Sequence, residues 1–325
     1  MVYLHLNMHP WNNNLWQRFC QQQQQQRLPH ALLLSGLAGL GKEEFASSIV
    51  ANVLCTSLQN DNSPCGQCHS CQLLSAGTHP DHIKIIPEET GKQIKIDQIR
   101  SLKNKQQLTA SVANWKTIII SPADAMNVSA SNSLLKLLEE PQQNTLLILI
   151  TDKPEKLPIT IRSRCQSYPF SSPSTEQGLE WLATQNINNQ DDELKKILQL
   201  ASGAPIKVLE MLDNNMSDQC QQIERDFDAI LSGQANPIVL AASWKDFELS
   251  EVLHYLHYLI KNRLIELIET KQKSTKNRHY LKISDCIMST IKLTSSLNNV
   301  NKTLLTEDFI VSVMQITHNS EHKVR

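Results

Sequence analysis

The sequence predicts a parallel α/β domain of the P-loop type in its first half, followed by all-α domains. Three observations support this fold class. Apolar strand-like runs alternate with helical patterns as far as residue 170, which is typical of a parallel sheet covered by helices. A glycine-rich segment that ends in a lysine directly follows the first of these runs. Beyond residue 170, only helical patterns occur.

Five segments are predicted to form the sheet. Several are apolar at consecutive positions, as expected of strands buried on both faces. The strands are expected at Ala31–Ser35, His82–Pro87, Thr117–Ser121, Thr145–Thr151 and, as a short fifth, near Ser167–Phe170. Between them, helical spacing occurs over Ile96–Leu108 and over Ser129–Glu140, where Pro141 ends the helix.

The all-α part is predicted to form two domains. We expect the α/β domain to span residues 1–170, a small helical domain 171–214 and a larger helical domain 215–325. The segment after Phe170, SSPSTEQ, is interpreted as a linker. Helices are predicted at Asp191–Leu200, Pro205–Leu212, Ser217–Leu231, Ser250–Glu269, Ser284–Leu297 and Thr306–Ile316. The glutamine run, Gln21–Gln26, is interpreted as the solvated end of a helix that carries Leu15, Trp16 and Phe19.

Composition restricts the class of function. The chain has 325 residues, of which 40% are hydrophobic and 19% charged. It has no run of about eighteen apolar residues, and its first residues do not resemble a signal peptide, so we expect a cytoplasmic protein without a membrane span. The net charge of −1 argues against binding nucleic acid by bulk electrostatics and favours protein partners.

The glycine-rich segment has the context of a phosphate-binding loop. Gly36-Leu-Ala-Gly39-Leu-Gly41-Lys42-Glu43 lies between a predicted strand and a predicted helix. Glycines let backbone N–H groups approach phosphate oxygens, and Lys42 could reach the terminal phosphates of ATP or ADP. The last position of the pattern requires Ser or Thr to bind magnesium, and Glu43 stands there instead.

The acidic pair that should end a later strand is also missing. The apolar strand Thr117–Ile120 runs into Ser121 and Pro122, and Asp124 lies too far along to replace the acids directly. Losing the hydroxyl and the acids removes the metal half of the phosphoryl-transfer machinery, so we expect no catalysis here. Two interpretations remain for the loop: a tight turn that only starts a helix, or residual nucleotide binding through Gly36, Gly39, Gly41 and Lys42.

Four of the eight cysteines are clustered. Two consecutive C-x2-C steps and one earlier thiol can surround a metal ion, and four thiolates are typical of structural zinc. An iron–sulfur cluster expects a further cysteine where Ser75 stands, and unligated thiols are the remaining alternative. The candidate ligands are Cys55, Cys65, Cys68 and Cys71. His69 and His79 could substitute for one of them, although each is more typical of a histidine on the protein surface. The other four cysteines are interpreted as free thiols of a reducing cytosol.

This zinc module at 55–71 is predicted to be a structural staple that orders a loop. A nucleic-acid-binding zinc knuckle is the alternative. Residues 55–81 contain no Lys, Arg, Phe, Trp or Tyr, which favours the staple.

Two later segments carry a resemblance to a known family. NSLLKLLEEP at Asn132–Pro141 and KLPITIRSRC at Lys156–Cys165 closely resemble the LLK-x-LEEP helix and the Ser-Arg-Cys motif of bacterial clamp-loader AAA+ subunits. A zinc module soon after the P-loop helix is also similar to that family. The resemblance covers about residues 25–170, weakens through the next helices, and is only architectural beyond about residue 215.

The details resemble one branch of this family. The ATP-hydrolysing gamma/tau subunits keep a complete P-loop, the acidic pair and a lid arginine, whereas Ile206 stands here in that arginine's place. Three parts of the ATP site are therefore damaged while Ser163-Arg164-Cys165 is intact. This combination resembles the delta prime subunits of the DNA polymerase III clamp loader. The retained Lys42 departs from their usual pattern and keeps nucleotide binding open.

The resemblance implies an AAA+ domain, a helical lid and a C-terminal collar that joins gamma/tau and delta subunits into a five-membered ring. That complex loads the sliding clamp onto primed DNA during replication, so a non-catalytic subunit of a DNA-directed DNA polymerase is expected. It also implies that Arg164, between Ser163 and Cys165, acts as an arginine finger in a neighbour's ATP site. Pairing of Arg164 with a carboxylate of its own domain is the alternative.

Two other functions compete with this interpretation. An active AAA+ clamp-loader ATPase is disfavoured by the missing metal ligands. A zinc-dependent nucleic-acid-binding adaptor finds support in a basic stretch, although such a run is usually a solvated face. The stretch comprises Lys92, Lys95, Arg100, Lys103, Lys105 and Lys116.

Overall fold

A computed structural model describes residues 8–89, 91–106, 110–185, 187, 191–213, 216–245, 247, 249–269, 275–296 and 301–318. Its sheet has five parallel strands in the order β2-β3-β4-β1-β5. The strands are β1 (Ala31–Ser35), β2 (His82–Ile85), β3 (Lys116–Ile120), β4 (Thr145–Thr151) and β5 (Gln166–Pro169). The predicted parallel five-stranded sheet is therefore confirmed, and β2 ends two residues earlier than expected.

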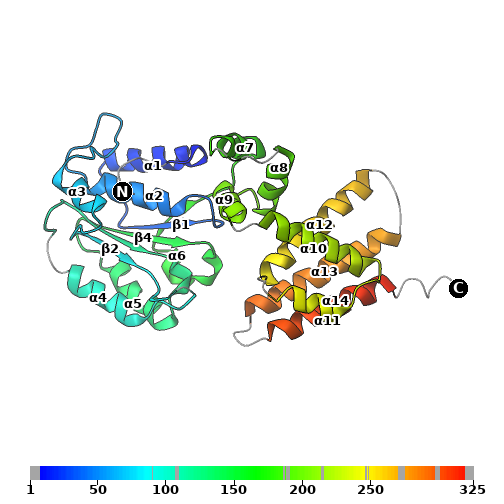
Figure 1. Ribbon diagram of the computed structural model, residues 1–325. Coiled ribbons are helices and arrows are strands. Elements are labelled where there is room, and N and C mark those ends of the chain that lie inside the picture. The colour runs from blue at the N-terminus through cyan, green and yellow to red at the C-terminus, as the bar shows by residue number, and fades with distance from the viewer. Residues whose placement is uncertain are drawn as a thin grey trace. The chain divides into compact units, whose positions relative to one another are not determined.

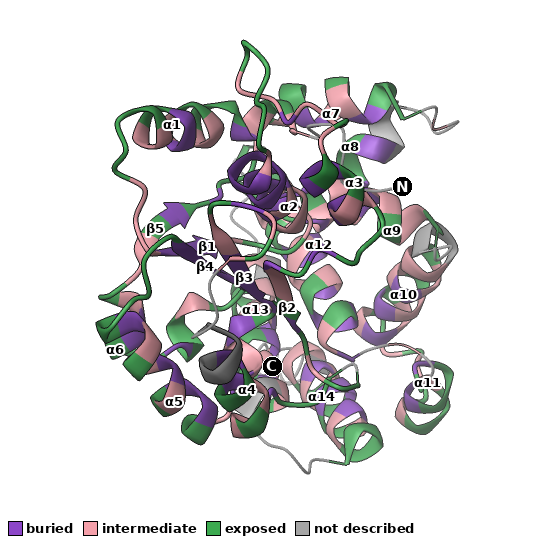
Figure 2. Ribbon diagram, turned by 90° about the vertical axis from the view of Figure 1, so that its left-hand side faces the viewer, coloured by how far each residue is buried: buried purple, intermediate pink, exposed green. Residues whose placement is uncertain are grey.

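The central strands β1, β3 and β4 are largely buried (Figure 2), and their side chains alternate between the two faces of the sheet. In β1, Leu33 joins Leu147 and Leu149 of β4 in a cluster that also takes in side chains of α4 and α5. Leu32 and Leu34 point to the opposite face because side chains alternate along a strand, and both are fully buried. Burial on both faces explains why these strands are apolar at consecutive positions.

Helices cover both faces of the sheet, with α1 and α2 on one side and α4 and α5 on the other (Figure 1). The helices of this region are α1 (Asn13–Gln24), α2 (Lys42–Leu54), α3 (His69–Ser75), α4 (Ile96–Gln106), α5 (Val128–Glu139) and α6 (Ile159–Arg162). Single 3-10 turns lie at η1 (Pro10–Asn12), η2 (Ala123–Ala125) and η3 (Pro154–Lys156). Together with the P-loop context, this arrangement is the AAA+ fold.

Two local predictions need correction. The segment after Phe170 is only partly a linker, because Ser174 and Gln177 form a capping box that starts α7 (Thr175–Ala183). The glutamine run is not wholly solvated, because Gln22 Oε1 accepts a hydrogen bond of 2.8 Å from the Tyr168 hydroxyl on β5. Two further helices, α8 (Asp191–Leu200) and α9 (Pro205–Asp213), follow α7.

The chain divides into two compact units, Met1–Val208 and Leu209–Arg325. The second unit is all-α and has a core of its own, which includes Phe227, Trp244, Leu253 and Phe309. Its helices are α10 (Met216–Leu231), α11 (Pro237–Ser243), α12 (Leu249–Glu269), α13 (Thr275–Ser296) and α14 (Lys302–His318).

Three of these helices differ from the sequence prediction, and one of them is α14, which begins four residues before the predicted start at Thr306. Helix α13 begins at Thr275, nine residues before the predicted start at Ser284. Helix α11 was not expected, although Asn236 caps it and Pro237 occupies its first turn, which is a recognised start signal. Among the described helices, none is long and apolar enough to cross a membrane.

Candidate functional site

The glycine-rich loop lies between β1 and α2, at the carboxyl edge of the sheet. Gly41 caps α2 in a left-handed conformation with a φ of 83°, and Gly39 has a φ of 77°. A Cβ atom on Gly39 would come within 2.6 Å of the Lys207 backbone nitrogen. Glycine at position 39 is therefore required both by its backbone conformation and by the close approach of α9.

Lys42 is held inside the loop rather than directed to solvent. Its side chain is 5% exposed and forms an ion pair with Asp152, in which Nζ and Oδ1 are 2.7 Å apart. The same ammonium donates hydrogen bonds to the backbone carbonyls of Gly36, at 2.8 Å, and Leu37, at 2.5 Å. Asp152 comes directly after β4 and was not identified from the sequence. Asp124 instead accepts a hydrogen bond of 2.6 Å from Thr151.

Glu43 connects the two positions from which magnesium would be bound. It stands at the position of the missing hydroxyl and accepts a hydrogen bond from the Ser121 hydroxyl, which stands where the acidic pair should begin. Lys84 of β2 also pairs with Glu43, with Nζ and Oε2 separated by 3.0 Å. The Glu43 carboxylate is thus paired with the Ser121 hydroxyl and with the Lys84 ammonium, at the two positions where the magnesium ligands are missing.

The N-terminal segment also packs on the loop. Trp11 Nε1 and Asn12 Nδ2 both donate to the backbone carbonyl of Leu40, at 3.1 and 2.9 Å. The rings of His9 and Trp11 stack with centroids 4.8 Å apart, and Trp181 of α7 meets both edge-on. These contacts join the N-terminal segment, the loop and α7 around one aromatic cluster.

The expected lid position also contacts this loop. Ile206, which stands in place of the lid arginine, is the second residue of α9, and its backbone N–H donates to the Gly39 carbonyl at 3.3 Å. This contact is made by the backbone, so it places α9 against the loop without supplying a positive charge.

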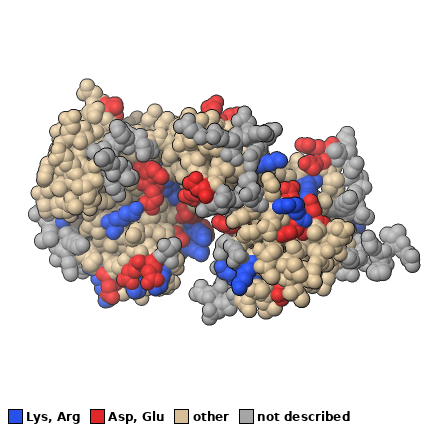
Figure 3. All heavy atoms as spheres, viewed as in Figure 1, with Lys and Arg blue, Asp and Glu red and all other residues tan. Residues whose placement is uncertain are grey.

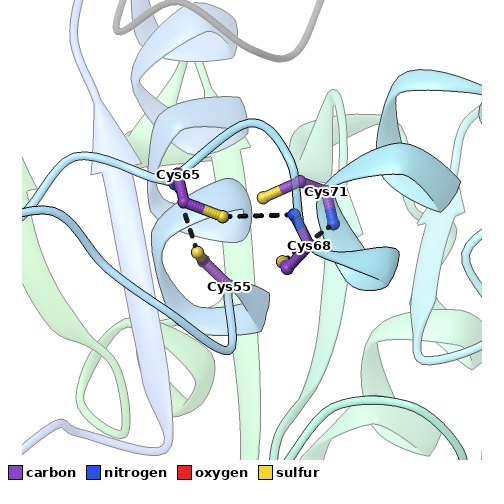
Figure 4. A group of neighbouring side chains, drawn as sticks. All are labelled: Cys55, Cys65, Cys68 and Cys71. Carbon is purple, nitrogen blue, oxygen red and sulfur yellow. Dashed lines mark hydrogen bonds between the residues drawn. The ribbon is translucent and has the colours of Figure 1, made fainter.

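The four clustered cysteines converge on one point (Figure 4). Cys55 ends α2, Cys68 caps α3, and the four sulfur atoms lie within 4.8 Å of one another. Backbone N–H groups donate to three of these sulfurs: Cys65 N to Cys55, Cys68 N to Cys65 and Cys71 N to Cys68, at 3.2–3.4 Å. The cluster could therefore hold one metal ion.

The four thiols differ in how readily they ionise. Burial opposes ionisation of Cys68, but hydrogen bonds from Thr56 and from the Cys71 N–H outweigh it and lower the pKa of Cys68 to about 6. Backbone hydrogen bonds from Gln67 and Cys68 lower the pKa of Cys65. Burial raises the pKa of both Cys55 and Cys71.

The two histidines near the cluster lie in different surroundings. His69 is exposed, as predicted. His79 is not a surface histidine: it is 5% exposed, and its Nε2 lies 2.8 Å from the Ser70 hydroxyl. Its Nδ1 accepts the Asp81 N–H at 3.1 Å, so Nε2 carries the proton and Ser70 passes the hydrogen bond on to the Leu54 carbonyl. This buried chain fixes the module against the start of β2.

Arg164 lies between α6 and β5 and pairs within its own domain. Its Nη2 is 2.9 Å from Glu139 Oε1 at the end of α5, and Nη1 donates to the Thr160 carbonyl at 3.0 Å. The side chain remains 38% exposed. The neighbouring Cys165 packs against the sheet core, where burial raises the pKa of its thiol to about 12. Ser163 Oγ donates to the Thr160 carbonyl at 3.2 Å.

The basic stretch is largely paired with acids. Lys92 and Lys95 each lie 2.6 Å from a glutamate, Glu89 and Glu88 respectively, and Arg100 lies 3.7 Å from Asp97. The side chains of Lys103 and Lys105 lie outside the described residues. On the face shown in Figure 3, Lys and Arg side chains lie next to Asp and Glu side chains. This mixed surface does not favour the nucleic-acid-binding adaptor.

Sequence comparisons with known proteins point to subunits of DNA polymerase III. A family model described as "DNA polymerase III, delta subunit" matches residues 11–174. DNA polymerase III subunit delta' of Pseudomonas aeruginosa is 37% identical over 243 residues, which are 75% of this chain and 73% of that protein. Subunit delta' of Escherichia coli is 32% identical over 62% of this chain and 59% of its own length. Subunit tau of Bacillus subtilis is 29% identical over 73% of this chain and 43% of its own length.

Proposed function

This chain belongs to the DNA polymerase III subunit delta' family, and we propose that it is a non-hydrolysing subunit of the clamp loader that completes a neighbour's ATP site. The observation that carries the first part is the hydrogen bond between Glu43 and Ser121. It fills both positions from which magnesium would be held, and phosphoryl transfer of this type depends on that metal. In this role the chain works beside gamma/tau and delta subunits to load the sliding clamp onto primed DNA.

The proposed contribution in trans rests on Arg164. A guanidinium is always charged and can fork onto phosphate oxygens, which suits it to a γ-phosphate of a neighbouring gamma/tau subunit. Its present partner, Glu139, is 51% exposed, and ion pairs at such surfaces contribute only about 0–1 kcal/mol. A phosphate group can therefore replace Glu139 at little cost. A guanidinium has five N–H donors, and the contacts with Glu139 and Thr160 use only Nη2 and Nη1.

The test uses the clamp-loader complex reconstituted with wild-type partners. Arg164→Ala is expected to lower ATP turnover or clamp loading, because one interfacial site loses its positive charge. A finger that completes a single site can contribute about 10³–10⁵ in rate, but only one of several sites in the ring depends on Arg164. The loss for the whole complex is therefore expected to be much smaller.

Glu139→Ala separates the finger from a structural role. It removes the intrachain partner and leaves Arg164 for the neighbour, so turnover and loading should stay at the wild-type level or rise. Arg100→Ala, which removes another surface ion pair, serves as the matched control. If Arg164→Ala and Glu139→Ala reduce activity equally, the pair is structural. If Arg164→Ala assembles normally and matches wild type in both assays, the assignment in trans is wrong.

We also propose that the cysteine cluster holds one structural zinc ion. Tetrahedral Zn–S bonds of about 2.3 Å place sulfurs about 3.8 Å apart, and the observed separations, all within 4.8 Å, accommodate this set. Four protein ligands leave no open position for a substrate. The ion would therefore supply folding energy to the 55–71 module and no chemistry.

A further inference from the structure

The ammonium of Lys42 has no donor left for a ligand. A lysine side chain has three N–H donors, and three acceptors surround this one: the carbonyls of Gly36 and Leu37 and the carboxylate of Asp152. The side chain is also 5% exposed. An incoming phosphate group would have to displace at least one of these acceptors before it could contact Lys42.

Sheet topology explains why Asp152 reaches this position. Strands β1 and β4 are parallel neighbours, and Ser35 at the end of β1 is in register with Thr151 at the end of β4. The next residues, Gly36 and Asp152, therefore leave the sheet side by side. Asp152 is 45% exposed, so water reaches its carboxylate while Lys42 is sealed beneath it.

The second pair arises at the same edge of the sheet. Strands β2 and β3 are parallel, and the Ser121 N–H donates to the Ile85 carbonyl at 3.0 Å, which brings Lys84 and Ser121 to the start of α2. Lys84 Nζ lies 3.0 Å from Glu43 Oε2, and the Ser121 hydroxyl donates to Glu43 Oε1. The glutamate thus has an ammonium as its counterion.

We propose that these two ion pairs are an autoinhibitory lock on the phosphate loop: Asp152 holds Lys42 in place of an anionic ligand, and Lys84 holds Glu43 in place of a divalent cation. Each ion pair is neutral overall, and Gly39 and Gly41 have the positive φ values that open the backbone of such a loop. The loop therefore keeps the glycine geometry of a nucleotide site while its charged groups are satisfied internally. The lock concerns the chain's own phosphate loop and is independent of Arg164.

The lock predicts a gain of function when its anion is removed. Asp152→Asn keeps the size of the side chain but removes the charge that competes with phosphate. In the full-length chain, binding of ADP labelled with a fluorophore on the ribose is followed by anisotropy without magnesium. We expect Asp152→Asn to bind about tenfold more tightly than wild type, equivalent to about 1.4 kcal/mol. Adding Glu43→Thr restores a hydroxyl for the metal, and binding should then strengthen with magnesium.

Two controls make the result specific. Asp97→Asn removes the same charge from an exposed site and should leave ADP binding unchanged. Lys42→Ala in the Asp152→Asn background should abolish the gain. Asp152→Ser, a second neutral variant, should reproduce it if Asp152→Asn folds poorly by circular dichroism. A folded neutral variant that binds no better than wild type overturns the proposal, as does a gain that survives Lys42→Ala or appears equally in Asp97→Asn.

Discussion

Acidification is expected to destabilise the α/β unit through His82 of β2. Its Nδ1 lies 2.9 Å from the Thr117 hydroxyl of β3. Burial, reinforced by the positive potentials of His79 and Lys84, lowers the pKa of His82 to about 4, although a hydrogen bond at Thr117 acts in the opposite direction. The imidazole is therefore neutral in the folded unit at pH 5, whereas it is protonated in the unfolded chain.

The sign and the size of this loss of folding stability follow from proton linkage. With a folded pKa of about 4 and an unfolded value of 6.5, the unfolded state binds more protons below pH 6.5. Stability is therefore fully present above pH 6.5 and is lost as the pH falls from 6.5 to 4. One pKa unit corresponds to about 1.36 kcal/mol, so the loss attributable to His82 is on the order of 2 kcal/mol at pH 5 and about 3 kcal/mol at pH 4.

Amide hydrogen exchange in β3 measures this effect inside the unit. The opening free energy of Thr117–Ile120, corrected for intrinsic exchange at each pH, should fall between pH 7 and pH 5 by about 2 kcal/mol more in wild type than in His82→Asn. Asparagine keeps a polar group near Thr117 but does not titrate. Protonation of the cysteine thiols affects both proteins and cancels in the difference. Parallel pH profiles for the two proteins would refute the reasoning.

Two further predictions concern the glycine-rich loop and the metal module. Gly39→Ala should lower the thermal midpoint more than Gly77→Ala: both have positive φ, which for alanine costs roughly 1–2 kcal/mol, but only a Cβ at Gly39 meets the Lys207 backbone. Equal shifts would show that α9 yields at this contact. Elemental analysis should find one zinc per chain in wild type and in Cys286→Ser, and a loss in Cys71→Ser; freshly reduced wild type without zinc would exclude the proposed module.

In the P-loop, the sequence predicts which ATP-site residues are missing but not which partners the charged residues have. The sequence alone showed that position 43 lacks a hydroxyl and that no acidic pair directly follows β3, because the ATP-site motifs require these residues at fixed positions. The sequence did not predict that Lys42 pairs with Asp152, which lies 110 positions further along the chain. The partner depends on β4 lying beside β1 in register, and strand order is a property of the assembled sheet. Arg164 and Glu139 are similar: each lies in a recognised motif, and only the packing of α6 on α5 brings them together.

What the sequence determined by itself is local. Runs of apolar residues marked the central strands β1, β3 and β4, because burial on both faces leaves few polar positions. The spacing of Cys55, Cys65, Cys68 and Cys71 marked a metal module, because short loops keep such thiols close. Tertiary structure decided which charges meet and which histidines are buried. Ion pairs and buried hydrogen bonds join residues far apart in sequence, and their partners are chosen by strand order and helix packing.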